Sequence, residues 1–133
     1  MISRLAALLA LPSLVASHFV LINPVSLGYD DTRELLGPCG GFTPTDRSTG
    51  VTDWPLSGSW INVLTTHEDV IWTYSMALLS DPTTWIPVTP KLHQLGVGQF
   101  CEPSMPPNPA WVGQDAILQV IQDAVDGLLY QVR

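Results

Sequence analysis

The strongest fold signal in this chain is the stretch Ala116-Ile117-Leu118-Gln119-Val120-Ile121, followed by Asp126-Gly127 and then by Leu128-Leu129-Tyr130-Gln131. Two apolar runs therefore flank an Asp-Gly pair. Asp-Gly supplies the positive φ angles that a tight hairpin turn requires. The pattern predicts a β-hairpin in the last part of the sequence and favours a fold built from strands.

Working outward from this hairpin, the sequence predicts further short strands separated by long loops. β-branched and aromatic residues recur at strand-like spacing in the segments His18–Ile22, Ser59–Leu64, Val70–Leu78 and Val97–Cys101. Glycine, proline and acidic residues make 29–47 a loop, with a helical turn expected at 32–36. Prolines at 82, 87 and 90 argue against regular central strands there.

This pattern predicts an all-β protein, an immunoglobulin- or fibronectin-like β-sandwich with long loops. The last predicted strand runs into Arg133, the final residue of the sequence. A sandwich that ends within a strand leaves an unpaired edge. We therefore expect a shortened domain that lacks its last strand or strands.

The beginning of the chain predicts a secretory signal peptide over residues 1–17. Arg4 precedes the apolar run Leu5–Val15, and Ala16-Ser17 provides the small residues of a cleavage site. Cleavage there makes His18 the first residue of a mature domain over 18–133. The alternative is a cut one or two residues away, which leaves His18 as an ordinary surface residue.

Charge and hydropathy exclude several classes of partner. The 133 residues include 12 acidic and 5 basic side chains, for a formal net charge of −7. An acidic chain without a basic run is a poor ligand for nucleic acid or anionic membranes. Beyond the signal peptide, no apolar stretch approaches the ~20 residues that a transmembrane helix needs.

Cys39 and Cys101 are the only cysteines, and in a secreted protein we expect them to be oxidised. The sequence leaves open whether they pair with each other.

An amino-terminal histidine has a specific chemical capacity. Its free α-amine and its imidazole Nδ1 can chelate one metal ion. Amine and imidazole nitrogens in a square arrangement suit Cu(II). If the cut lies before His18, the sequence therefore predicts a copper site at this residue.

The order of several short motifs resembles a fungal family of secreted copper proteins. The matching residues are His18-Phe19-Val20-Leu21, Pro24, Gly28, Glu34, Pro38-Cys39-Gly40-Gly41, Arg47, Trp54-Pro55-Leu56-Ser57-Gly58, His67, Gly96-Val97-Gly98-Gln99-Phe100-Cys101, Leu118-Gln119-Val120-Ile121 and Asp126-Gly127-Leu128-Leu129-Tyr130-Gln131. The family comprises lytic-polysaccharide-monooxygenase-like proteins and includes the copper acquisition factors. The similarity covers nearly all of residues 18–133.

The resemblance implies a histidine brace, in which the first mature histidine and a second histidine hold one Cu(II) per chain. The matching positions are His18 and His67. Neutral imidazole is a common metal ligand near neutral pH. His93, the third histidine, has no family match, and we expect it to be a surface residue.

The chain departs from the family where members usually continue Tyr-Gln-Cys-Ala-Asp, since it reads Tyr130-Gln131-Val132-Arg133. The resemblance implies that this aspartate is a further copper ligand and that the cysteine belongs to a disulfide, so either Cys39 or Cys101 lacks its partner. The spacing selects no substitute ligand among Asp115, Asp123 and Asp126, and Glu68 adds a carboxylate beside His67. Family members also carry a Ser-rich tail and a glycolipid-anchor signal, neither of which this sequence contains.

These features predict an extracellular copper-binding protein that acts in copper capture or cell-surface copper homeostasis, with a cell-surface copper transporter as the receiving partner. We expect binding rather than catalysis. One alternative is a copper-dependent polysaccharide monooxygenase, whose substrate platform would need tryptophans that strand spacing more often places in the core: Trp54, Trp60, Trp72, Trp85 and Trp111. The other alternative is a truncated family member without function.

Overall fold

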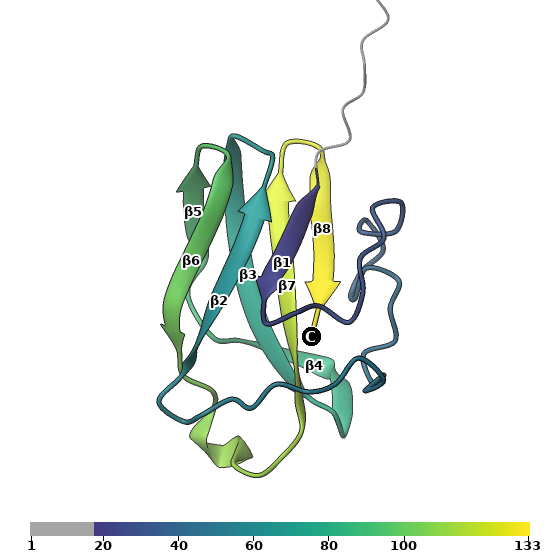
Figure 1. The fold of residues 1–133 in the computed structure, drawn as a ribbon, viewed down its shortest axis with the longest axis vertical. Helices are drawn as coiled ribbons and strands as arrows, with labels where there is room; N and C mark the ends of the chain where they lie inside the picture. Colours follow the sequence, from purple (N-terminus) through teal and green to yellow (C-terminus); the bar gives the residue numbers. More distant parts are fainter. Residues whose placement is uncertain (1–17) are drawn as a thin grey trace, which may run out of the picture.

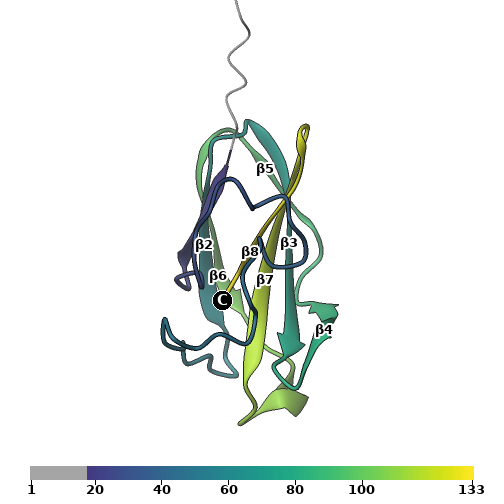
Figure 2. The same cartoon turned by 90° about the vertical axis from the view of Figure 1, so that its right-hand side faces the viewer.

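The computed structural model describes residues 18–133 as two antiparallel β-sheets packed face to face (Figure 1; Figure 2). The three-stranded sheet has the order β1-β2-β6, from β1 (Phe19–Asn23), β2 (Ser59–Thr65) and β6 (Gly98–Met105). The five-stranded sheet has the order β4-β3-β7-β8, and β5 also pairs with β3. Its strands are β3 (Asp69–Leu78), β4 (Asp81–Pro87), β5 (Leu92–Leu95), β7 (Ala116–Ala124) and β8 (Gly127–Val132). The prediction of an all-β sandwich is confirmed.

The core lies between the two sheets because alternate residues of each strand point inward. Phe19 and Ile61 come from the three-stranded sheet, and Trp72 and Val120 come from the five-stranded sheet. The rings of Phe19 and Trp72 meet edge to face across the interior, with centroids 5.2 Å apart. This aromatic pair packs β1 against β3 and so fixes the start of β1 relative to the larger sheet.

The predicted hairpin is confirmed as β7 and β8. The two strands pair from Gln119 opposite Val132 up to Ala124 opposite Gly127, and Gly127 has a positive φ of 128°. β7 also pairs with β3 along its whole length, which makes β3 and β7 the centre of the sheet. The hairpin turn lies at the same end of the sandwich as the start of β1 and the end of β2 (Figure 1).

The stretch that contains Pro82 and Pro87 forms no central strand, as predicted: both lie in β4, at the sheet edge, where proline is tolerated. Three details differ from the sequence predictions. β5 was not predicted, because its four residues are too short to show a period. β6 continues past the predicted end at Cys101 through Pro103, which an edge strand also tolerates. Residues 32–36 form turns rather than helix, and η1 (Pro109–Trp111) is the one short 3-10 helix in residues 18–133.

A long connection between β1 and β2 covers part of the five-stranded sheet. Leu27 and Cys39 from this connection form a second buried cluster with Ile117 of β7 and Val132 of β8. Ile117 is adjacent to the core residue Leu118, so this cluster lies on the opposite face of β7 from the main core. Two backbone hydrogen bonds anchor the connection to β8, from the Leu27 amide to the Val132 carbonyl and from the Tyr130 amide to the Glu34 carbonyl, both at 2.8 Å.

The predicted signal peptide, residues 1–17, lies outside the described residues. Within residues 18–133, no helix has the length and apolar character needed to cross a membrane.

Candidate metal centre

His67 lies just beyond the end of β2 and is almost completely buried. Its backbone N–H donates to the Thr65 hydroxyl at 3.1 Å. The Thr65 hydroxyl in turn donates to the side-chain oxygen of Gln122 on β7. Thr65 and Gln122 are both buried, so this polar contact joins the two sheets directly beneath His67.

Asp126, in the turn between β7 and β8, is the carboxylate that the structure brings to His67. Its Oδ1 lies 3.2 Å from the His67 Nε2. The His67 side chain is 9% exposed and the Asp126 side chain 48% exposed. The geometry of the contact is not that of a hydrogen bond, and among the described residues the buried Nε2 has no hydrogen-bond partner. A buried imidazole nitrogen without such a partner can offer its lone pair to a metal ion.

The main chain of His18 lies beside His67, but its ring does not join the pair. Phe19 is paired with Thr65, which places His18 opposite Thr66, the neighbour of His67. The His18 nitrogen lies 3.3 Å from the Thr66 hydroxyl. The His18 ring is turned toward the long connection, with Nε2 3.2 Å from the Asp31 carbonyl oxygen. Accordingly, residues 18–133 contain no preformed group of three His, Cys, Asp or Glu side chains that could hold a metal.

Behind the start of β1 lies a buried carboxyl group that sequence reasoning did not assign a role. The Gln131 side-chain amide donates to Glu34 Oε1 at 2.6 Å and to the Phe19 carbonyl, while Gln131 Oε1 accepts from the Leu21 amide at 3.0 Å. Burial raises the pKa of the Glu34 carboxyl to about 7, and the Gln131 hydrogen bond and the nearby His18 only partly oppose this effect. The network ties the long connection and β8 to the strand that begins just after His18.

The other acidic candidates lie away from His67. Asp115 lines a cavity at the far end of the sandwich, and Asp123 is exposed on β7. Glu68 is exposed, and within residues 18–133 no hydrogen bond or ion pair joins its carboxylate to His67. Asp126 is therefore the one of these candidates that the fold selects. His93 is on the surface of β5, as expected, with Nε2 2.6 Å from Asp69 Oδ1.

Cys39 and Cys101 do not pair with each other, and neither forms a disulfide within residues 18–133. Cys39 is buried beneath the long connection, whereas Cys101 is exposed on β6. The two cannot meet, because they lie on opposite sides of the sandwich. Cys39 packs in the cluster that contains Val132, the position at which the resembled family has a cysteine.

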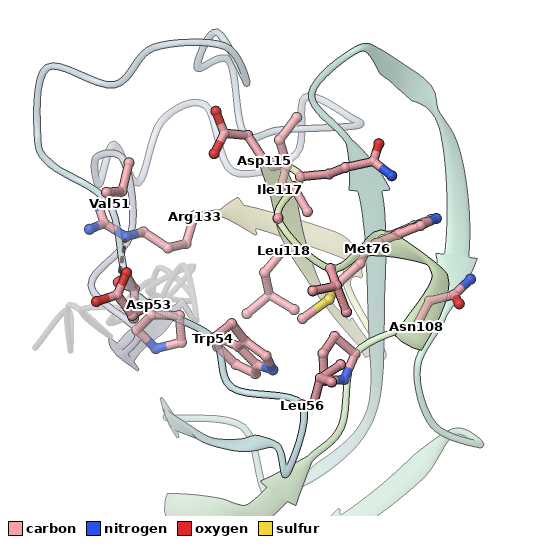
Figure 3. Close-up of a pocket in the computed structure, with 18 of the residues that line it drawn as sticks. Val51, Asp53, Trp54, Leu56, Met76, Asn108, Asp115, Ile117, Leu118 and Arg133 are labelled. Carbon is pink, nitrogen blue, oxygen red and sulfur yellow. Dashed lines mark hydrogen bonds between the residues drawn. The ribbon is translucent and has the colours of Figure 1, made fainter.

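A cavity of about 460 Å³ lies at the end of the sandwich opposite to His67 (Figure 3). Trp54, Met76 and Leu118 give it an apolar wall, and its polar rim includes Asp115 and Arg133. None of the lining residues is His18, His67 or Asp126. This cavity and the candidate metal ligands are therefore separate features.

Comparison with known proteins places the chain in a family. The family profile described as "Copper acquisition factor BIM1-like" matches residues 16–131. The chain is similar to the "Lytic polysaccharide monooxygenase-like protein X325" of Yarrowia lipolytica, with 31% identity over 92% of this chain and 51% of that protein. It is also similar to the "Uncharacterized protein AFUA_6G02800" of Aspergillus fumigatus, with 32% identity over 75% of this chain and 42% of that protein.

The chain thus spans about half the length, or less, of the curated relatives it matches. The family profile, in contrast, covers almost all of the described residues, including β1, His67 and the β7–β8 hairpin. This protein belongs to the BIM1-like family of copper acquisition factors.

Proposed function

We propose that this protein is secreted and binds one Cu(II) through a histidine brace of His18 and His67, in copper capture or cell-surface copper homeostasis. The observation that carries the proposal is the buried His67 Nε2, which lacks a hydrogen-bond partner among the described residues and faces the Asp126 carboxylate. The strand pairing brings the His18 main chain to the same place. The family supports copper as the metal.

The brace needs three nitrogens: the amine and ring of His18 and the ring of His67. In the full chain the His18 nitrogen is a peptide amide, because Ser17 precedes it. Removal of residues 1–17 converts it to an amine with an ordinary pKa of ~7.7–8.0, which must release its proton to bind metal. The His18 ring must also turn from the Asp31 carbonyl toward His67. Asp126 then adds one oxygen ligand and negative charge.

Residues outside the ligand set hold these groups in place. Thr65 and Gln122 fix the backbone of His67 against β7. Gln131 and Glu34 fix the start of β1, on which His18 is carried. Rigid support of this kind matters because misoriented ligands lower metal affinity. A cell-surface copper transporter is the partner to which we propose the copper is passed.

Binding rather than polysaccharide cleavage is favoured by the position of the aromatic residues. A cleaving enzyme needs exposed aromatic or polar groups around its copper. Within residues 18–133, Trp72 is buried in the core, and Trp54 and Trp111 line the cavity at the far end. Trp60 is exposed on β2, but near its start, away from His67. Trp85 is partly buried on β4, which pairs with the end of β3 that lies away from His67. None of these five tryptophans forms a platform at the His67 end.

The amine provides the sharpest test of the brace. Protein that begins at His18 is compared with protein carrying one extra Gly before it, which replaces the amine with an amide. We expect electron paramagnetic resonance of the Cu(II) form to show about three equatorial nitrogens, and the added Gly to weaken binding by about 100-fold or more. Equal copper affinities of the two proteins would place the metal elsewhere.

The enzyme alternative has its own assay. Copper-loaded protein is incubated with a reductant, oxygen and cellulose, chitin or xylan, and the soluble products are analysed by mass spectrometry. We expect no oxidised oligosaccharides. Copper-dependent release of such products, absent in the His67→Ala variant, would instead establish polysaccharide oxidation.

A further inference from the structure

The outer face of the three-stranded sheet carries no charged side chain. Strand pairing and alternation place one set of residues on it. These residues are Val20 and Asn23 of β1, Trp60, Asn62 and Leu64 of β2, and Gln99, Cys101 and Pro103 of β6. The whole chain, in contrast, has a formal net charge of −7. Two copies that approach each other through this face therefore meet with the least like-charge repulsion.

The face is apolar as well as uncharged. Val20 and Leu64 are directly opposite each other in the β1–β2 pairing, and both are partly exposed. Trp60, on the same face of β2, is exposed. The outer face of the five-stranded sheet differs, since Asp69, His93 and Asp123 lie at one end of it and the long connection covers β7 and β8 at the other.

The exposed thiol of Cys101 lies on this uncharged face, directly opposite Asn62 in the β2–β6 pairing. Asn62 is only 8% exposed and donates its side-chain N–H to Gln99 Oε1 at 3.2 Å. Its Oδ1 is buried without a hydrogen-bond partner among the described residues. A buried acceptor without a donor is costly, so the β2–β6 pairing beside Cys101 leaves one polar atom unsatisfied in the single chain.

We propose that this face docks against the same face of a second copy and that the two Cys101 thiols join in a disulfide. Cys39 is buried, so Cys101 is the thiol that a second copy can offer. The same residues of the two copies then face each other around a two-fold axis, as in an isologous dimer. A small-molecule disulfide such as glutathione disulfide is the oxidant: the two thiols lose two protons and two electrons as the S–S bond forms, and the oxidant is reduced to two thiols.

The test uses the full chain, secreted from a eukaryotic host and incubated with glutathione disulfide. We expect intact mass and non-reducing electrophoresis to show a dimer of the wild type and of Cys39→Ala, but not of Cys101→Ser. Peptide mapping of the wild type should identify a Cys101–Cys101 link, which makes the result independent of how well the variants fold.

A matched pair of charge substitutions separates docking from random oxidation. Leu64 is 36% exposed on the uncharged face, and Leu128 is 42% exposed on the other sheet. Leu64→Asp places two carboxylates across the two-fold contact and should slow dimer formation by about tenfold or more, whereas Leu128→Asp should leave its rate unchanged. Equal rates for both variants, a Cys101–glutathione mixed disulfide in place of the dimer, or dimers of Cys101→Ser would each overturn the proposal. None of these readouts depends on copper.

Discussion

Two histidines of this protein lie against an aspartate, yet their surroundings differ. His93 Nε2 lies 2.6 Å from Asp69 Oδ1, with side chains that are 54% and 65% exposed. His67 Nε2 lies 3.2 Å from Asp126 Oδ1, with the histidine 9% exposed. The exposed pair is the closer one, and its nitrogen is already hydrogen-bonded. Short distance between an imidazole and a carboxylate therefore does not define a metal site in this fold.

Burial and neighbours distinguish the two pairs. The His93 ring is exposed to water, which competes for its hydrogen bonds. The contact between His93 and Asp69 therefore contributes little to the free energy of unfolding. His67 is shielded from water, and its Nε2 has no hydrogen-bond partner among the described residues. His18, which we propose as the first residue of the mature domain, lies beside it. Only the His67 pair combines an available nitrogen, a carboxylate and an additional source of nitrogens.

The largest expected effect comes from removing the imidazole of His67, and removal of the imidazole of His93 is the matched control. His67→Ala should weaken Cu(II) binding by more than the ~100-fold that mutation of supporting residues can cost, because it removes a ligand itself. His93→Ala should leave the affinity unchanged. Competitive titration against a copper chelator measures both. Similar affinities of the two variants would show that the buried pair has no special role.

Removal of the Asp126 carboxylate should have a smaller effect on copper affinity. Asp126→Asn keeps the shape of the side chain but removes its charge, and we expect copper affinity to fall by about tenfold. Asp69→Asn, the matching change in the exposed pair, is the control and should bind copper as the wild type does. A change in the copper hyperfine splitting or in the electronic spectrum of Cu(II) in Asp126→Asn alone would sharpen the assignment. Unaltered affinity and spectra would remove Asp126 from the ligand set.

Burial also predicts a pH dependence at Glu34. Its native carboxyl has a pKa raised to about 7 by burial, against an ordinary value of 4.5. Between pH 4.5 and about pH 7, the Glu34 carboxyl of the native state holds a proton that the same carboxyl has released in the unfolded chain. Raising the pH through this window therefore lowers the free energy of unfolding, and the loss is complete above about pH 7. Glu34→Gln should reduce this decline, as measured by denaturant unfolding of metal-free protein from pH 4 to 8. An identical pH profile for wild type and variant would contradict the prediction.

The smallest effect is expected from the exposed pair itself. His93→Ala or Asp69→Asn should change the free energy of unfolding by less than about 1 kcal/mol, because exposed ion pairs contribute little. Thermal unfolding of both variants at low and high salt measures this. A larger loss in either variant would mean that the pair stabilises the β3–β5 edge more than its exposure indicates.

Much of the fold was predictable from local patterns. The β7–β8 hairpin, the strands at 59–64 and 70–78 and the sandwich itself follow from alternation and turn chemistry, which act over a few residues. The turn itself is shifted by one residue from the prediction: Val125 and Asp126 form it, and Gly127 already pairs with Ala124. β5 and the continuation of β6 through Pro103 did not follow, because pairing with a neighbouring strand overrides weak or unfavourable local preference. The candidate ligands His18 and His67 were identified from the cleavage site and the resemblance, and neither depended on knowledge of the fold.

The sequence by itself determined which residue types are available: a histidine that the predicted cleavage would make N-terminal, a second histidine ahead of a predicted strand, three candidate aspartates and two cysteines. Only the tertiary structure decided which of them meet. It placed Asp126 rather than Asp115 or Asp123 beside His67, buried Cys39 against Val132 and left Cys101 on an uncharged face. The physical reason is that these contacts join strands and turns distant along the chain, so they depend on sheet register and on the packing of the two sheets, which no local pattern encodes.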